Sequence, residues 1–535
     1  MSTPVVYAPS TQPQRTSVDL PITVGTQLHN DTVDEADVVV IGSGCGGAAL
    51  ACRLAEAGKK VIVVEQGGYH ARTDFDQREL HMLAKIDGGR GLDAASDGGV
   101  SFTYGNNVGG ASVHYWADSF RTPPDRLAYW QREYGMTGHD LATLTPHFAT
   151  IENDLNVHLA DDGYVNPMNA KVRDAARALG WHVEKVPQAR RGCVRSGHCM
   201  QGCAYDAKQS QLVTYIPRAL SAGARLYADV RALRFSSTTG TCRTLECAVL
   251  DRSSGLPTGV KLTLKAKAFV VAGGGYATPE LLLRQPGVKE RLPHLGEHFF
   301  CNPCAQAHAF FDDDITQWRN IPAAWGVEQF RLPTYANGAW VEGGYLLMAN
   351  QLHPGMLAAC LLVSPRRQRE IMGQYKRLGG TIAWIDDVET GRVRLDGGLD
   401  ARRVIDMPLD GDNGRRLRDA WRKQARLLFK AGAREVFFGD VNDTRLSPGD
   451  DVDAGVAGID LRPGRNVFAA PHPGGACRMA TSAAHGVVDM EHRLFGSDNI
   501  YVADPSVWPS PPSVDPSLTI MAFSFVCADI IRDRV

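Results

Sequence analysis

The chain has 535 residues, of which 44% are hydrophobic and 22% are charged, and its formal net charge is −2. This length predicts more than one domain, and the composition is typical of a globular protein rather than a disordered or fibrous one. The near-neutral charge argues against nucleic acid or an anionic membrane surface as a partner, and the apolar runs are too short for a transmembrane helix.

The first 35 residues are polar and contain several prolines, which predicts an N-terminal arm (residues 1–35). They lack a twin arginine and the charged-then-apolar layout of a signal peptide, so we expect a cytoplasmic protein. The 12 cysteines are then expected to be reduced thiols rather than a disulfide framework.

A strand–helix–strand pattern begins after this arm. The apolar run VVVI at 38–41 predicts a buried parallel strand, and the small residues from 48 to 57 predict a helix that ends near Gly58. A second run, VIVVE at 61–65, predicts the next strand. Because the glycines between the first strand and the helix follow the spacing G-x-G-x-x-G, the pattern predicts a dinucleotide-binding unit.

Individual positions of this unit have mechanical roles. Gly42 permits the tight turn, Gly44 lets the backbone approach a pyrophosphate, and Gly47 lets the helix pack against the strand. The N-terminus of the helix then faces the phosphates. Glu65, at the tip of the second strand, is expected to accept hydrogen bonds from ribose hydroxyl groups. An acid there argues against NADP but does not separate NAD from FAD.

Further motifs follow along the chain, and together they carry a family resemblance. They are GNNVGGASVHYW (105–116), ARRGCVRSGHCMQGCAYDAKQSQLVTYIPRAL (189–220), VVAGGGYATPELLLRQ (270–285), PHPGGACRM (471–479) and PPSVDPSLTIM (511–521). From about residue 36 to the C-terminus, the chain resembles the glucose–methanol–choline (GMC) oxidoreductase family. The second motif is similar to the branch that includes long-chain alcohol oxidases and the flavin subunits of some membrane-linked sugar dehydrogenases.

The resemblance implies FAD as the cofactor and an α/β fold, more fully an α+β composite. A Rossmann-like FAD-binding domain would be discontinuous, because its motifs lie at both ends and in the middle of the chain. We expect it to comprise residues 36–120, 190–300 and 465–535. Residues 121–189 and 301–464 would form the substrate-binding domain, with an antiparallel sheet backed by helices.

The residues of the second domain agree with that expectation. TIAWIDD (381–387) and GRVRLDG (391–397) are strand-like, and a charged helix is predicted over 414–433 with its arginines on a solvated face. An aromatic-rich stretch is predicted either to line the substrate pocket, where it would suit an apolar or aromatic alcohol, or to pack in the core. Its members are Trp318, Trp325, Phe330, Trp340 and Tyr345.

The resemblance also implies how the flavin is held. The segment 105–116 would run along the flavin ring, with Asn106 or Asn107 offering a side-chain hydrogen bond near the reactive edge. Val230, at the end of an expected strand RLYADV, would pair with adenine. Asp504 would lie near the ribityl chain or the pyrophosphate.

A helix is expected to begin after Pro516 and Ser517 with its N-terminus toward the flavin, where the helix dipole favours negative charge. His114 is the position through which some family members attach FAD covalently, whereas others keep an unbonded histidine there, and both alternatives remain open. The candidate cofactor-binding residues are Gly42, Gly44, Gly47, Glu65, Asn106, Asn107, Gly109, Gly110, Ser112, His114, Val230, Asp504, Pro516 and Ser517.

The candidate catalytic residues are His472 and Asp515. In the family, a histidine in the first position accepts the alcohol proton while a hydride leaves the same carbon for the flavin. Histidine suits that role because its ordinary pKa is near neutral. Ala476 stands where the family has threonine. Asp515 stands where the family has asparagine or a second histidine.

The aspartate at 515 leaves several interpretations open. An asparagine amide can donate a hydrogen bond to an alkoxide, whereas an ionised carboxylate can only accept one. Asp515 can bind a protonated amine or hydroxyl of the substrate, or share the base role with His472. It can also stay protonated as a donor, or impair ordinary alcohol oxidation.

Three cysteines cluster in the branch-specific motif with the spacing C-x5-C-x3-C. In the sugar dehydrogenase branch, such cysteines hold an iron–sulfur cluster, for which thiolates are the usual ligands. With His198 as a fourth ligand the loop could instead bind zinc, or it could be a structural loop of buried thiols. The cluster candidates are Cys193, Cys199 and Cys203.

These features predict an FAD-dependent oxidoreductase, an alcohol dehydrogenase or oxidase, that abstracts a proton at His472 and transfers a hydride to the flavin. The electron acceptor would be oxygen, a quinone or a redox protein, and no nucleic acid is expected as a partner. One alternative is a non-redox flavoenzyme of the same fold, of the lyase or decarboxylase type. Others are an FAD/iron–sulfur electron-transfer subunit and a flavin-binding protein without catalysis.

Overall fold

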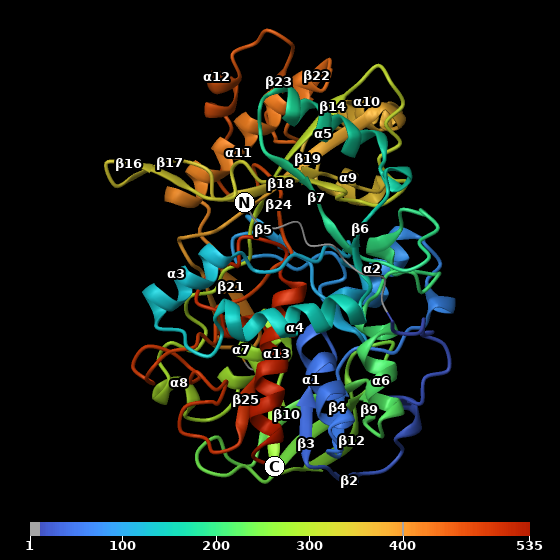
Figure 1. Cartoon of the computed structure of the whole chain (residues 1–535), viewed down its shortest axis with the longest axis vertical. Helices are drawn as coiled ribbons and strands as arrows, with labels where there is room; N and C mark the ends of the chain where they lie inside the picture. The colour runs from blue at the N-terminus through green and yellow to red at the C-terminus, as the bar shows by residue number, and fades with distance from the viewer. Residues whose placement is uncertain (1–10, 399–400) are drawn as a thin grey trace.

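The computed structural model describes residues 11–398 and 401–535, and the first ten residues of the expected N-terminal arm lie outside that range. The chain forms two stacked halves along the long axis (Figure 1). One half is built on a parallel sheet, and the C-terminus lies at its outer end. The other half is built on a mainly antiparallel sheet. We call them the parallel-sheet half and the antiparallel-sheet half.

The parallel sheet has the strand order β1-β9-β4-β3-β13-β25. Strands β4, β3, β13 and β25 are buried because they are apolar runs, apart from Glu65 at the end of β4, and the sequence predicted β3 and β4. The strands are β1 (Thr23–Val24), β9 (Arg225–Ala228), β4 (Val61–Glu65), β3 (Val38–Ile41), β13 (Ala268–Val271) and β25 (Ile500–Val502).

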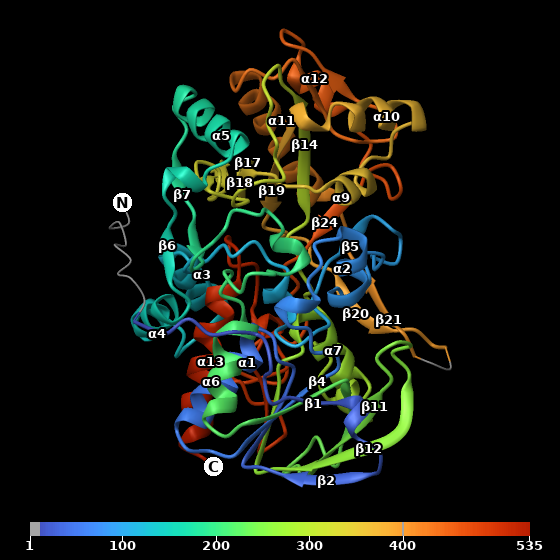
Figure 2. The ribbon, with the colours of Figure 1, turned by 90° about the vertical axis from the view of Figure 1, so that its right-hand side faces the viewer.

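Helices cover one face of this sheet, and a second sheet lies on the other side (Figure 2). Helix α1 packs between α13 and α6, and α4 packs on α13. The second sheet has the order β10-β11-β12-β2. These elements are α1 (Cys45–Glu56), α4 (Leu141–Asp154), α6 (Tyr215–Ser221), α13 (Ser517–Arg532), β10 (Val230–Phe235), β11 (Thr244–Leu250), β12 (Pro257–Lys265) and β2 (Thr32–Glu35).

Two local expectations differ from this arrangement. Strands β1 and β2 belong to the two sheets, so the part of the expected arm from residue 23 onward is tied into the parallel-sheet half. Val230 does not end a strand RLYADV. The backbone turns at Asp229, which has a left-handed φ of 60°, and Val230 begins β10. The sequence has no local signal for the pairing of β1 and β2 with these sheets or for the turn at Asp229.

The antiparallel sheet has the order β23-β22-β14-β19-β18-β15-β7, with β24 paired to β14 and β5. Helices α5 and α11 back it, which confirms the expected architecture of a sheet backed by helices. The elements are β23 (Arg445–Leu446), β22 (Glu435–Phe437), β14 (Cys304–Phe310), β19 (Leu378–Ile385), β18 (Tyr345–Ala349), β15 (Trp325–Val327), β7 (Val183–Lys185), β24 (Phe468–Ala470), β5 (Val100–Phe102), α5 (Pro167–Ala178) and α11 (Gly411–Lys430).

Helix α11 corrects one prediction about its charges. Its arginines do not form a uniformly solvated face, because Arg416 is buried and its guanidinium lies 5.9 Å from the centre of the Trp340 ring. The stem of an arginine can cover apolar surface while its head stays paired with an aromatic ring. The burial of Arg416 could therefore not be predicted from the charged sequence of the helix.

The remaining elements connect or cover the two halves. The hairpin of β20 and β21 leaves the antiparallel sheet and packs on α7 of the other half. No helix in the described part of the chain is both long and apolar enough to cross a bilayer. These elements are α2 (Glu79–Ile86), α3 (Pro124–Tyr134), α7 (Gly274–Leu283), α8 (Val288–Arg291), α9 (Pro354–Ala359), α10 (Pro365–Gly373), α12 (Val452–Ala457), β6 (Val157–Leu159), β8 (Pro187–Ala189), β16 (Thr334–Ala336), β17 (Ala339–Glu342), β20 (Arg392–Leu395) and β21 (Arg403–Asp406).

Candidate active site

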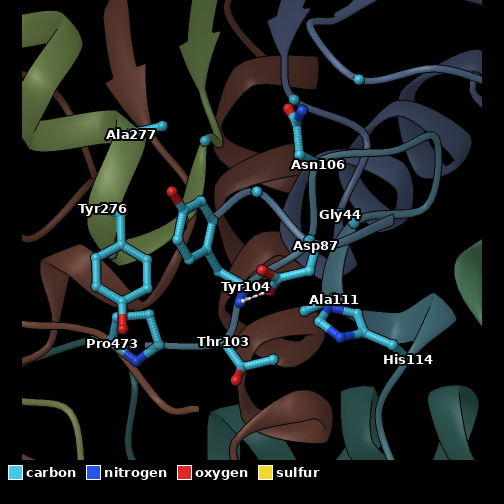
Figure 3. Close-up of a pocket in the computed structure, with 18 of the residues that line it drawn as sticks. Gly44, Asp87, Thr103, Tyr104, Asn106, Ala111, His114, Tyr276, Ala277 and Pro473 are labelled. Carbon is cyan, nitrogen blue, oxygen red and sulfur yellow. Dashed lines mark hydrogen bonds between the residues drawn. The ribbon is translucent and has the colours of Figure 1, made fainter. Parts of the chain in front are cut away.

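A cavity of about 1240 Å³ lies between the two halves. The carboxyl ends of β3, β4 and β13 form one side of it, and side chains of β14 and β19 form the other. The carboxyl edge of a parallel sheet is where ligands bind in such folds. Figure 3 shows part of the wall, where Asn106, Ala111 and His114 lie around one side and Tyr104 and Tyr276 around another.

The predicted dinucleotide turn forms part of this wall. Gly42 and Gly44 line the cavity, and Gly42 has a left-handed φ of 104° that favours glycine. Gly47 lies behind the wall, where a Cβ atom would clash with the carbonyl oxygen of Gly42. Helix α1 begins after Gly44 without a side-chain cap, so the free N–H groups of its first turn are available to a ligand.

Glu65 lines the same part of the cavity and is already hydrogen-bonded. Its carboxylate accepts from the backbone N–H and the hydroxyl of Ser43, at 3.0 and 2.7 Å, and from the N–H of Gly67 at 2.8 Å. Burial raises its pKa above the usual range. Glu65 therefore also fixes the turn that the glycines form, in addition to the ribose contact expected of it.

Asn106 and His114 carry buried polar atoms without a hydrogen-bond partner among the described residues. Oδ1 of Asn106 and Nε2 of His114 are both of this kind, and both residues line the cavity. Burial, with a smaller contribution from Lys208, lowers the pKa of His114 to about 3, so its imidazole is neutral. Buried polar atoms in native proteins are rarely left unpaired, so these two point to a bound group.

The other residues of the 105–116 motif divide into lining and supporting positions. Gly110 and Ser112 line the cavity, and the Ser112 hydroxyl donates to the carbonyl of Gly109 at 2.6 Å. Asn107 and Gly109 are not among the lining residues. The Asn107 amide donates to the Ile86 carbonyl at 2.9 Å, and the Gly109 N–H donates to the Ser43 hydroxyl at 3.0 Å.

A second uncapped helix begins at the cavity. Pro516 and Ser517 line it, and α13 starts at Ser517 without a side-chain cap. Val230 and Asp504 line it as well. Asp504 accepts from the N–H groups of Gly274 and Ser506, both at 2.9 Å, and burial raises the pKa of Asp504.

These features fit the flavin dinucleotide that the sequence implies. The N-termini of α1 and α13 both lack side-chain caps at the cavity, which suits the pyrophosphate and the electron-rich side of a flavin. Asn106 and His114, whose side chains carry the unpaired polar atoms, line the same cavity as these two helix N-termini. The backbones of Gly110 and Gly44 lie so close together that a Cβ added at Gly110 would be 2.7 Å from the Gly44 Cα. Neither residue therefore puts a side chain between the two segments.

His472 and Asp515 form a pair at the cavity wall. The distance from His472 Nε2 to Asp515 Oδ1 is 3.2 Å, and the two side chains are 12% and 13% exposed. The second oxygen, Asp515 Oδ2, is buried and has no hydrogen-bond partner among the described residues. The Trp384 ring lies 5.3 Å from the His472 ring, centre to centre. The two predicted residues therefore meet although 42 positions separate them in the sequence.

Neighbouring loops hold the His472 segment in place. The His472 N–H donates to the Cys301 carbonyl at 3.3 Å. Asp387, at the end of β19, accepts from the N–H groups of Cys301 and Asn302 at 2.8 and 3.1 Å. Burial raises the pKa of Asp387 to about 7. The position of His472 thus depends on a carboxyl group from the antiparallel sheet.

Asp386, the preceding residue, holds the Asp515 loop. Arg126 of α3 forms a buried ion pair with Asp386 and donates to the hydroxyl of Ser513, which in turn donates to Asp386. Ser513 has a left-handed φ of 64°, two residues before Asp515. Such a backbone persists where surrounding contacts enforce it. Adjacent carboxyl groups on one strand end therefore position both candidate catalytic residues.

We expect Asp386→Asn to destabilise the fold by about 3–5 kcal/mol, because it leaves the Arg126 charge buried and unpaired. It should also slow flavin reduction by about 10- to 100-fold through displacement of the Asp515 loop. The control is Asp125→Asn. Asp125 also lies on α3, and its ion pair with Arg331 is more exposed than the Arg126–Asp386 pair, so its loss should cost about 1 kcal/mol or less. Equal unfolding curves for the two variants, measured in urea, would contradict the role of Asp386 in holding the Asp515 loop.

Asp118 is an acidic residue of the site that the sequence reasoning missed. It lines the cavity, is 2% exposed, and accepts a hydrogen bond from the Gln188 side chain. Burial and the nearby Asp515 raise the pKa of Asp118 well above its usual range. Only its place two residues after the 105–116 motif could have drawn attention to it.

The three clustered thiols are held by separate partners. Cys199 Sγ accepts from the Arg190 guanidinium at 3.3 Å, Cys193 Sγ from the N–H of Arg195 and Cys203 Sγ from the N–H of Lys208, both at 3.4 Å. Within the described residues, no group of three or more His, Cys, Asp or Glu side chains is placed to hold a metal ion. The geometry gives no support to the iron–sulfur or zinc hypotheses.

The predicted aromatic pocket is not part of the cavity wall. Trp318 stacks on Tyr375 with 4.9 Å between ring centres. Trp325, Phe330 and Tyr345 are buried, as the interpretation of core packing predicted, whereas Trp318 and Trp340 are only partly buried. Two tryptophans that were not singled out, Trp116 and Trp384, line the cavity instead. The residues found away from the wall are Trp318, Trp325, Phe330, Trp340 and Tyr345.

Comparisons with known proteins show the family and the fold of the chain. Two family models, both described as GMC oxidoreductase, match residues 37–304 and 387–524. An uncharacterized GMC-type oxidoreductase of Mycobacterium tuberculosis is 29% identical, covering 96% of this chain and 78% of its own. Long-chain-alcohol oxidase FAO3 of Arabidopsis thaliana is 26% identical, covering 93% and 68%. The structure of pyridoxine 4-oxidase from Mesorbium loti has the same fold, with a TM-score of 0.69 at 18% identity, covering 92% and 98%.

Proposed function

We propose that this chain, which belongs to the GMC oxidoreductase family, oxidises the CH–OH group of a small-molecule alcohol, with His472 as the proton acceptor. FAD is the cofactor of this family. The observation that carries the finer assignment is the His472–Asp515 pair, 3.2 Å apart at the wall of the cavity that the two helix N-termini face.

His472 would accept the hydroxyl proton of the alcohol. Its ring is nearly buried, so a bound substrate would exclude most water from it. The hydrogen bond from its backbone N–H to the Cys301 carbonyl helps to keep the imidazole at the wall of the cavity. A positioned base of this kind contributes about 10²- to 10⁴-fold to a rate. When bound, FAD supplies the acceptor for the hydride.

Asp515 would stabilise the imidazolium that forms when His472 takes the proton. A carboxylate oxygen 3.2 Å away is placed to accept a hydrogen bond from the ring nitrogen once that nitrogen carries the proton. It cannot donate to the alkoxide as an asparagine amide would. The N-terminus of α13, which begins two residues later, would supply a favourable field for the negative charge that arises in the reaction.

The remaining wall supports a mixed apolar and polar substrate. Leu352 and Trp384 supply apolar and aromatic surface, and Gln306 and Asn350 supply amides. Long-chain-alcohol oxidase FAO3, one of the relatives, acts on an apolar class of alcohol by its name. The amides and the two carboxyl groups make this chain's cavity suited to a more polar alcohol.

The test is anaerobic mixing of the holoenzyme with a panel of primary and secondary alcohols. We expect the visible flavin absorbance to fall with at least one of them. On admission of air, formation of hydrogen peroxide would identify an oxidase, and a requirement for a quinone or a protein acceptor would identify a dehydrogenase. Turnover with no change in flavin absorbance would contradict the proposal in favour of a lyase or decarboxylase.

A further inference from the structure

The carboxylate of Asp515 has one oxygen without a hydrogen-bond partner in the part of the chain that the structure describes. Oδ1 faces His472 Nε2, whereas Oδ2 is buried without a partner among the described residues. An ionised carboxylate accepts hydrogen bonds and cannot donate them. Leaving a charged oxygen desolvated and unpaired is costly, so Oδ2 requires a donor that arrives with the ligand.

Among the described residues, the part of the antiparallel-sheet wall that includes Trp384, which contacts the His472 ring, supplies no positive charge for this oxygen. The side chains that β14, β19 and the end of β18 contribute to the cavity are all uncharged. Arg403 of the β21 hairpin also reaches the cavity, but it pairs with Asp93 and Glu280. The uncharged lining residues are Cys304, Gln306, Asn350, Leu352, Ile382 and Trp384.

A second carboxyl group, Asp118, lies in the same part of the cavity, and burial and the nearby Asp515 raise its pKa, which favours keeping a proton on Asp118. Asp118 lies near enough to Asp515 that the two groups interact electrostatically. Arg190 offsets part of the Asp118 charge, since it donates to Gln188, which in turn donates to Asp118. Asp515 has no such relay. Among the described residues, the His472 ring lies 3.2 Å from Oδ1 of Asp515, and Asp118 is a second titratable group that interacts with Asp515.

We propose that the alcohol substrate carries a protonated amine, and that Asp515 selects it by accepting an N–H hydrogen bond at Oδ2. This inference rests on the proposed alcohol oxidation and names its substrate class. An ammonium group brings both a hydrogen-bond donor for Oδ2 and a positive charge. The rings of Trp116 and Trp384, which line the same cavity, favour a cation further. Asp515 is thus a specificity-determining residue.

The test compares two non-oxidisable ligands of the same shape, benzamidine as the cation and benzamide as its neutral counterpart. Each is titrated into the anaerobic holoenzyme and followed by the change in the flavin spectrum. We expect the parent protein to bind benzamidine at least about tenfold more tightly than benzamide. Asp515→Asn should abolish that preference, and Asp312→Asn, a change at an exposed carboxylate, should keep it.

Equal affinity for the two ligands in the parent protein would overturn the inference, as would a preference that survives in Asp515→Asn. The parent protein alone decides the question if the variant does not retain FAD. Failure of the proposed function is recognised separately, with 4-(aminomethyl)benzyl alcohol and 4-methylbenzyl alcohol. If neither bleaches the flavin but benzamidine is still preferred, the alcohol assignment is wrong and the cation site stands.

Discussion

Anaerobic flavin reduction by an alcohol substrate is expected to slow by about 10²- to 10⁴-fold when His472 is replaced with alanine. The reason is that the hydroxyl proton then has no positioned acceptor, since Asp515 Oδ1 has lost the imidazole 3.2 Å away that it would stabilise. The FAD content should remain near that of the parent, because the His472 backbone rather than its ring bonds to Cys301. Stopped-flow absorbance measures the rate.

Two controls accompany that measurement. His485→Ala removes an exposed imidazole from the same C-terminal segment and should leave the rate unchanged. Added imidazole should partly restore the rate of His472→Ala, because it can occupy the space of the missing ring and accept the proton. An unaltered rate in His472→Ala would show that the proton goes to another group, for which Asp515 is the nearest alternative.

Replacement of Gly47 with alanine is expected to remove most of the bound FAD and to lower stability by about 3 kcal/mol or more. The added Cβ would clash with the Gly42 carbonyl oxygen and lie 3.2 Å from Val40 Cγ1, so helix α1 would have to move away from β3. That movement would displace the N-terminus of α1 from the phosphate position. Flavin absorbance per protein and urea unfolding measure the two effects.

Matched glycines separate the packing effect from the ligand effect. A Cβ at Gly44 meets only the Gly110 Cα, at 3.9 Å, so Gly44→Ala should keep the stability of the apo-protein and weaken FAD binding. Gly373, at the end of α10, has nothing within 4 Å of a Cβ, and Gly373→Ala should change neither quantity. If Gly47→Ala retained full FAD and parent stability, the predicted helix–strand packing would be wrong.

The strand–helix–strand unit could be predicted because its signals are local. A buried parallel strand reads as an apolar run, and the glycine spacing follows from the steric needs of the turn between β3 and α1. The structure has the second strand at Val61–Glu65 as expected and begins the helix at Cys45. Motif order along the chain was enough to indicate the family, because five separate motifs occur together in one sequence.

Other features could not be predicted, since they depend on contacts between distant segments. Asp118 interacts with Asp515 across 397 positions, and Asp386 bonds to Ser513 across 127. The expected strand end at Val230 failed because a left-handed Asp229 turns the chain into a different sheet. Asp118 and Asp386 are isolated acidic residues in the sequence, and no local pattern around either of them predicts its distant partner.

By itself the sequence determined the dinucleotide unit and the family, and it indicated His472 and Asp515 as candidate catalytic residues. These features depend on glycine geometry and short motifs, which act over a few residues. Only the tertiary structure decided what surrounds Asp515. Among the described residues, it left Oδ2 without a partner, brought Asp118 close, and put uncharged side chains of β14 and β19 on the cavity wall. The charge balance of a cavity is a sum over segments that meet only in the fold, so no local pattern encodes it.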